Sequence, residues 1–191
     1  MDTLKNKRIE QILYYKNVIL NHQNDPPIDL IEYIFLQSLI LPETDPERDI
    51  ILFYVLVSDT DIPNFIFKSD DFDVLNIVKT DISGKIKINK KRCILIAPPA
   101  KILFFFIKHN FNFDNIQLLI VQDVKKFLLN PCYRHQCEYL ILKIRENKRI
   151  ILLGNRISTV LYTLIQNKLQ INFKFCKIKK NVSTQKNPEP Y

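Results

Sequence analysis

Seven short apolar runs, rich in branched side chains, constrain the fold of this sequence more than any other feature. None shows the apolar–polar alternation of a half-exposed strand, so they are typical of strands buried on both faces, as in a parallel sheet. The runs are Asn17–Leu20, Ile50–Val57, Asp73–Val78, Cys93–Ala97, Gln117–Val121, Ile150–Leu153 and Asn172–Ile178.

Helical stretches separate these runs. In the first, Ile31, Ile34 and Phe35 recur near one helical face. The predicted helices are Ile28–Leu41, Lys101–His109, Tyr133–Glu146 and Ile157–Leu169. Strands that alternate with helices indicate βαβ units, so we expect an α/β fold with a doubly wound, mostly parallel sheet. The three consecutive aromatics at 104–106 cannot all face one side of a helix, so at least one is expected to be exposed.

The chain length of 191 residues suits one domain. We assign residues 1–180 to it and expect residues 181–191, which are polar and contain two prolines, to form a flexible tail. No apolar run reaches the length that a bilayer needs, and the charged start is not a secretory signal. We therefore expect an intracellular protein, nuclear or cytoplasmic, with no membrane contact.

The net charge of +8 favours acidic partners such as nucleic acid, although an A+T-rich genome would also enrich lysine. Cys132, His135 and Cys137 form a partial metal-ligand cluster without a clear fourth ligand, so no metal site is assigned. The histidines, His22, His109 and His135, have no nucleophile in motif context and are expected at the surface or in loops.

In an open α/β sheet, ligands bind at the carboxyl ends of the strands, so the residues after each strand matter most. The run KNVILNHQNDPPIDLIEYIF has the strand–loop–helix order of a phosphate loop. Together with the motif-like segments below, it resembles the first, RecA-like (P-loop NTPase-like) domain of a DEAD-box RNA helicase. The resemblance covers about Ile9 to Lys180 and implies a single RecA-like domain.

The family's phosphate loop reads A-x-T-G-x-G-K-T, and the positions here are degenerate. Asp25 replaces a glycine, Pro26 and Pro27 remove two N–H donors, Ile28 replaces the lysine and Asp29 replaces the hydroxyl residue. Such a loop lacks the converging amides, the lysine and the Mg²⁺ ligand that phosphate binding needs. We therefore expect no nucleotide cofactor.

The family's D-E-A-D box corresponds to Gln122, Asp123, Val124 and Lys125. In the family the first carboxylate holds the Mg²⁺ shell and the glutamate orients water. Gln122 carries no charge, and Lys125 inverts the charge of the last position. The later S-A-T turn corresponds to Gly154, Asn155 and Arg156, which lack its hydroxyls.

The RNA-contacting positions of the resemblance are also altered. In the segment FYVLVSDTDIP, Thr60 remains while carboxylates replace the proline and arginine of the family loop. Lys101 matches the arginine of the family's T-P-G-R motif, and Lys91 and Arg92 precede it in a basic run. We take Thr60, Lys91, Arg92 and Lys101 as RNA-binding candidates.

The sequence therefore predicts a non-catalytic pseudo-helicase domain, an adaptor or scaffold in a protein or ribonucleoprotein assembly. Protein partners are expected, and RNA is a possible one. The alternative is a divergent RNA-dependent ATPase that uses ATP and Mg²⁺ and is completed by a partner chain, with Asp123 and Lys101 in its favour. A third reading is an unrelated α/β domain.

Overall fold

The computed structural model describes residues 12, 14–23, 28–40, 50–55, 73–76, 92–109, 116–144 and 148–178. Its centre is a seven-stranded sheet in the order β3-β4-β2-β5-β6-β1-β7. The strands are β1 (Asn17–His22), β2 (Ile50–Val55), β3 (Asp73–Asn76), β4 (Arg92–Ala97), β5 (Ile116–Val121), β6 (Arg149–Asn155) and β7 (Lys174–Lys177). All six neighbouring pairs are parallel, which confirms the prediction from the seven apolar runs.

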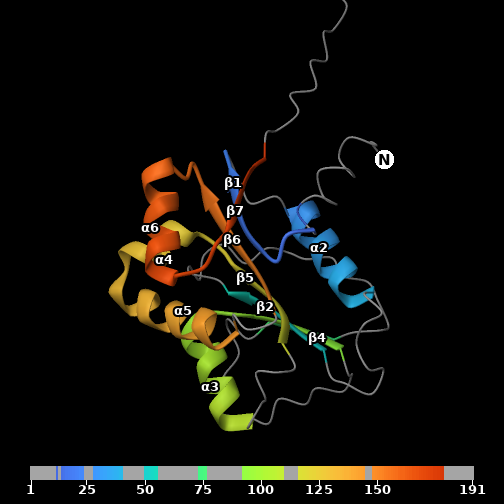
Figure 1. Ribbon diagram of the computed structural model, residues 1–191. Coiled ribbons are helices and arrows are strands. Elements are labelled where there is room, and N and C mark those ends of the chain that lie inside the picture. Colours follow the sequence, from blue (N-terminus) through green and yellow to red (C-terminus); the bar gives the residue numbers. More distant parts are fainter. Residues whose placement is uncertain are drawn as a thin grey trace, which may run out of the picture.

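Helices cover both faces of the sheet, as parallel strands require. They are α2 (Ile28–Ile40), α3 (Pro99–His109), α4 (Val124–Leu129), α5 (Pro131–Ile144) and α6 (Thr159–Leu169). Figure 1 shows α2 on one face and α3, α4, α5 and α6 on the other. Among the described residues, no helix has both the length and the apolar content to cross a membrane.

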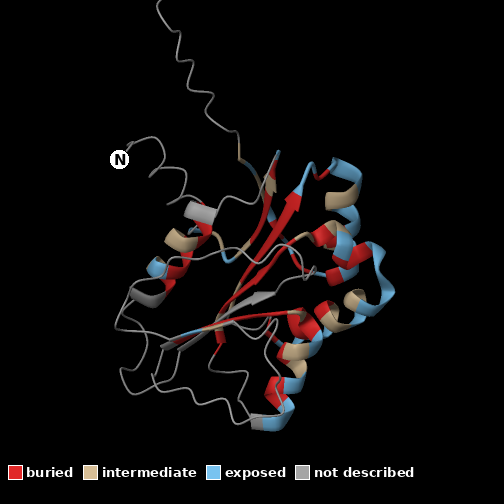
Figure 2. Cartoon of the chain, turned by 180° about the vertical axis from the view of Figure 1, so that it is seen from behind, coloured by how far each residue is buried: buried red, intermediate tan, exposed pale blue. Residues whose placement is uncertain are grey.

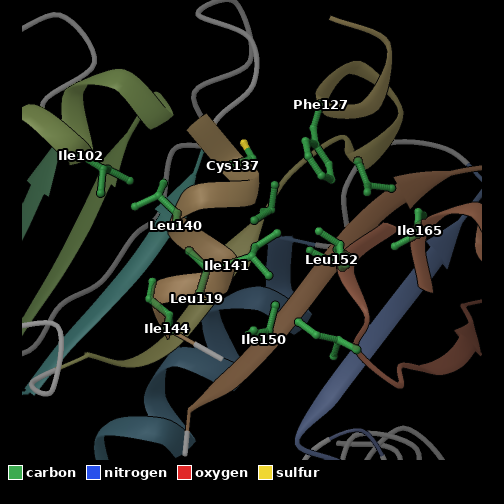
Figure 3. Packing of buried hydrophobic residues seen from close by; sticks show 14 of the residues in the cluster. Ile102, Leu119, Phe127, Cys137, Leu140, Ile141, Ile144, Ile150, Leu152 and Ile165 are labelled. Atoms are coloured by element: carbon green, nitrogen blue, oxygen red, sulfur yellow. The ribbon is translucent and has the colours of Figure 1, made fainter. Parts of the chain in front are cut away.

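Alternate side chains of β1, β4, β5 and β6 pack into two separate cores. In β1, Val18 and Leu20 join the core under α2, whereas Ile19 joins the core under α3–α6. Neighbouring β6 alternates in the same way, with Ile150 and Leu152 in one core and Ile151 and Leu153 in the other. The burial view in Figure 2 shows β5 and β6 buried along most of their length. The close-up in Figure 3 shows Leu140, Ile141 and Ile144 of α5 packed over the sheet.

The short helix α4 was not predicted. Its six residues are too few to show a helical period, and the segment was interpreted only as a motif position. Asp123 caps its start with a left-handed backbone (φ 54°), and its side chain accepts a hydrogen bond from the backbone N–H of Lys126 at 3.4 Å. Asn130 ends α4 and also caps α5, where its Oδ1 accepts from the Cys132 N–H at 3.0 Å.

The other helix boundaries lie within two residues of the predictions, and the starts of α3, α5 and α6 have physical reasons. Pro99 and Pro131 begin α3 and α5, where a missing N–H has no helical partner to lose. Ser158 caps α6, and its hydroxyl accepts from the Leu161 N–H at 3.2 Å. The exposure of the aromatic triplet is confirmed, since Phe104 is half exposed while Phe105 and Phe106 are buried.

Helix α4 buries one aromatic side chain together with Val124 and Leu128, and the aromatic gives a direct test of the packing. Phe127 is fully buried, whereas Leu129 on the same helix is 81% exposed. Phe127→Ala should lower the free energy of unfolding by about 3–5 kcal/mol because it leaves a cavity between α4 and the sheet. The matched variant Leu129→Ala should change it by less than about 0.5 kcal/mol. Urea unfolding followed by circular dichroism measures both, and equal effects would contradict this packing.

Candidate functional site

The carboxyl ends of β5, β6 and β1 lie side by side and define the candidate site. The parallel register aligns Asn21 with Gly154 and His22 with Asn155, and Val121 with Leu152. The three strands therefore deliver their following residues to one edge of the sheet. We call this the carboxyl edge and define it by Asn21, His22, Gln122–Lys125 and Gly154–Ile157.

Asn21 ties the β6–α6 turn to the end of β1. Its Oδ1 accepts a hydrogen bond from the Ile157 N–H at 2.8 Å, and its Nδ2 donates to the Ile157 carbonyl at 3.2 Å. The Arg156 N–H also donates to the His22 carbonyl at 3.0 Å, and Arg156 itself has a left-handed backbone (φ 50°). The turn that follows β6 is therefore fixed to β1 by side-chain and backbone hydrogen bonds.

The motif position after β5 is occupied by side chains with structural contacts. Gln122 is 8% exposed, and Val124 is fully buried. The carboxylate of Asp123 caps α4 and lies 3.5 Å from the Lys126 ammonium. Asp123 is thus the one carboxylate among the four positions, and it points its oxygens toward its own helix. Lys125 is half buried on the first turn of α4.

Gly154 brings the β5–α4 and β6–α6 turns into direct contact. A Cβ atom placed on Gly154 would lie 2.5 Å from Ile157 Cδ1 and 2.8 Å from Val124 Cγ1. Gly154 does not have a positive φ, so the glycine is required for space and not for backbone conformation. Val124 and the turn at Gly154 therefore pack against each other and occupy the space between the two motif positions.

The phosphate-loop positions and some RNA-binding candidates fall outside this description. Asp25, Pro26 and Pro27, together with Thr60 and Lys91, lie outside the described residues. Ile28 and Asp29 begin α2, but their side chains also lie outside what the structure describes.

The remaining RNA-binding candidates lie near opposite ends of the same strand, β4. Arg92 is the first residue of β4 and so lies at the amino end of the strand. Lys101 is half buried in the first turn of α3, after the carboxyl end of the same strand. Six strand residues separate the two ends by about 16 Å, so the structure does not bring Arg92 and Lys101 together.

One expectation about the histidines was wrong. His22 was expected in a loop or at the surface, but it is the last residue of β1 and is only 7% exposed. The prediction ended that strand two residues early, because the polar Asn21 follows the apolar run and precedes His22. His135 is exposed on α5, as predicted, with Nδ1 4.0 Å from Glu138 Oε2.

The partial metal cluster is dispersed around α5. Cys132 is exposed at the start of the helix, whereas Cys137 is buried and lies in the core shown in Figure 3. Positions five residues apart lie on different sides of a helix. Across the described ranges, no three His, Cys, Asp or Glu side chains gather as a ligand group.

No protein-family model matches the chain, and no curated protein sequence matches it. Solved structures do match, and DEAD-box proteins are among them. A Dbp5 variant from S. cerevisiae bound to Nup159, a Gle1 variant, IP6 and ADP has a TM-score of 0.62 and 10% identity over 93% of this chain and 48% of its own. The Dbp5 variant bound to RNA and ADP BeF3 has a TM-score of 0.62 and 10% identity over 91% and 46%.

A DEAD-box protein from the hyperthermophile Methanococcus jannaschii has a TM-score of 0.61 and 16% identity over 91% of this chain and 48% of its own. This chain therefore spans about half the length of the structures it matches. Identities this low show the fold alone. The fold is a single α/β RecA-like domain similar to the RecA-like domains of DEAD-box proteins, which confirms the predicted fold class.

The contact between Gly154 and Val124 can be tested with a double-mutant cycle. Gly154→Ala should lower the free energy of unfolding by about 1–3 kcal/mol, because the new Cβ overpacks the contact. Val124→Ala removes Val124 Cγ1, one of the three opposing side-chain atoms, and so relieves part of the overpacking. The double variant should therefore be less destabilised than the sum of the single variants, by at least about 0.5 kcal/mol. Simple additivity in urea unfolding would contradict the contact.

Cys132 and Cys137 should differ in reactivity toward thiol reagents. Burial, with a smaller effect of the neighbouring Glu138 charge, raises the pKa of the Cys137 thiol to about 12, whereas Cys132 is exposed. At pH 8 the native protein should be labelled at Cys132 and not at Cys137, as mass spectrometry of peptides would show. The Cys137 thiol of the unfolded chain ionises near pH 9, whereas the folded chain keeps this thiol protonated. The free energy of unfolding should therefore fall as the pH rises from about 9 toward 12. Rapid native labelling of Cys137 would contradict this burial.

Proposed function

We propose that this chain is a non-catalytic, helicase-like domain that acts as an adaptor or scaffold in a protein or ribonucleoprotein assembly. The observation that carries the proposal is the set of structural contacts that Asp123 makes. Its carboxylate caps α4 and pairs with Lys126, while the adjoining Val124 is buried against Gly154. A carboxylate that caps a helix and a side chain that is buried in an apolar contact do not supply a metal ligand and a water-orienting base.

The sequence of the β1–α2 connection supports the same conclusion. A phosphate loop presents backbone N–H groups and a lysine to the nucleotide. The side chains of the loop must attract, and not repel, the negative phosphates. Here Asp25 brings a negative charge, and Pro26 and Pro27 have no N–H to donate. Ile28 offers no cation. The phosphate-loop positions and the positions that would hold metal and water are therefore both altered in this chain.

Partners of an adaptor of this kind are suggested by the similar structures. Dbp5 is bound to Nup159 and a Gle1 variant in one of them and to RNA in another. A RecA-like domain that no longer serves hydrolysis can still offer its outer surface as a docking site for proteins and RNA. We propose protein partners for this chain and nucleic acid as a further partner.

A second candidate is a divergent ATPase whose site is completed by another chain. One observation favours it: Asp123 keeps a carboxylate directly after β5, in a left-handed turn. This candidate requires that Asp123 exchange its contacts with the α4 cap and Lys126 for a bound metal. It also requires that the second chain supply the phosphate-binding groups.

Hydrolysis assays separate the two candidates. The full chain with Mg²⁺–ATP, with and without single-stranded RNA, should release phosphate at the rate of the buffer. Asp123→Asn is the informative variant, because asparagine retains the helix cap and tolerates the left-handed backbone but has no charge. It should leave the rate unchanged. The motif-restoring variant Gln122→Asp with Asp123→Glu should also stay inactive, because the phosphate loop remains altered.

The same assays contain the result that favours the second candidate. Hydrolysis above background that Asp123→Asn abolishes would contradict the non-catalytic proposal. Hydrolysis that appears only when the chain is purified with its cellular partners, and that is lost with Asp123→Asn, would favour the partner-completed ATPase. An active DEAD-box protein serves as the positive control, and circular dichroism checks the folding of each variant.

A further inference from the structure

The positive charge of this chain is concentrated in its last quarter. Residues 147–188 contain nine Lys and Arg residues and no Asp or Glu. The remaining 19 basic and 20 acidic residues nearly cancel, so this segment accounts for the net charge of +8. Such segregation is typical of a surface that meets a polyanion, because a genome-wide enrichment in lysine would spread the charge along the chain.

This segment contains β7, the outermost strand of the sheet beside β1. Lys174 and Lys177 are both exposed there, and β7 pairs with β1 from Val18 to Asn21. Figure 1 shows the two strands side by side at that side of the sheet. Residues 14–23, which contain β1, have no acidic side chain either. Within the described part of the chain, the ion pairs of Lys126 and Lys168 involve Asp123 and Glu138, and no carboxylate pairs with Lys174 or Lys177.

Aromatic rings accompany these lysines on both faces of the strand. The Lys174 ammonium lies 5.1 Å from the centroid of the Tyr15 ring, on the side of the α2 core. The Lys177 ammonium lies 6.0 Å from the Phe175 ring, on the side of the larger core. We call Tyr14, Tyr15, Lys174, Phe175 and Lys177 the β7 edge.

The rings are held in place by their neighbours. Phe175 packs against Tyr162 with centroids 5.1 Å apart, and the Tyr162 hydroxyl donates to the Phe173 carbonyl at 2.6 Å. Tyr14 packs edge-to-face on Tyr15 at 5.4 Å, yet Tyr14 is itself 84% exposed. An exposed ring packed on a second ring that has a cation over it has the composition of a stacking platform for bases.

We propose that the β7 edge binds single-stranded nucleic acid, with its lysines at the phosphates and the ring of Tyr14 stacked on a base. Exposed lysines on an edge strand also guard against strand pairing between molecules, but that role needs neither the rings nor the charge segregation. A duplex presents no unstacked base to Tyr14, and a flexible single strand can pass around a strand of four residues to meet both of its faces.

This surface is separate from the RNA-binding candidates of the sequence. Arg92 begins β4 and Lys101 follows it, and β2, β5, β6 and β1 lie between β4 and β7 in the sheet. Binding at the β7 edge uses no residue of the carboxyl edge and requires no nucleotide. It therefore holds whether or not the chain hydrolyses ATP.

Fluorescence anisotropy of the full chain with a labelled twelve-nucleotide oligouridylate tests the proposal. The charge-reversed variant Lys174→Glu with Lys177→Glu should bind at least about tenfold more weakly at 0.1 M salt. Its plot of log K against log salt should lose about 1.4 units of slope, the value for two phosphate contacts on a single strand. Tyr14→Ala should weaken binding about fivefold or more through the loss of stacking.

A matched control is available on the outer faces of α3 and α5. Lys108 lies over the Phe104 ring at 5.9 Å, and Lys143 lies over the Tyr139 ring at 5.6 Å. Lys108→Glu with Lys143→Glu changes the net charge by the same amount as the β7-edge variant. It should therefore retain the wild-type affinity within about twofold if the site is the β7 edge and not the charge of the whole chain.

Three results would overturn the proposal. The first is wild-type binding weaker than about 100 μM at 0.1 M salt, the weak end of non-specific binding. The second is an equal loss of affinity in the β7-edge and control variants. The third is equal competition by polyglutamate, which would assign the surface to an acidic protein. Circular dichroism of each variant ensures that a loss of binding is not a loss of folding.

Discussion

The structure depends on one constraint: every strand of the sheet runs parallel to its neighbours. Parallel strands cannot be joined by tight hairpins, so each connection must cross over a face of the sheet. These crossovers bury both faces, and side chains of β1 and β6 alternate between the core under α2 and the core under α3–α6. Any binding or chemistry is therefore left to the ends of the strands, the outer helix faces and the outermost strands.

At the carboxyl edge, the residues that occupy the motif positions stabilise one another. Asn21 bonds both backbone groups of Ile157, and Ile157 and Val124 fill the space that Gly154 leaves. Asp123 is turned to α4 as its cap. The described residues at these positions thus have structural contacts: Asp123 caps a helix, and Val124 and Gly154 join two turns.

The sequence predicted the sheet well because buried parallel strands are continuous apolar runs, and all seven runs form strands. It missed α4, since six residues carry no period and Asp123 was interpreted as a motif residue and not as a helix cap. It also missed the burial of His22. The packing of Val124 on Gly154 and of Lys174 on Tyr15 joins residues far apart in the chain, so only the tertiary structure reveals these contacts.

The central claim is that the carboxyl edge does not hold a nucleotide, and thermal unfolding of the full chain with and without millimolar Mg²⁺–ATP tests it most directly. Binding to the folded state alone, at a hundredfold excess over Kd, would raise the midpoint of a domain of this size by about 5 °C or more. The account predicts no Mg²⁺-dependent rise, under conditions where an active DEAD-box domain shows one. A clear Mg²⁺-dependent rise would mean that the residues after β1 and β5 hold phosphate in another geometry, and it would contradict the account.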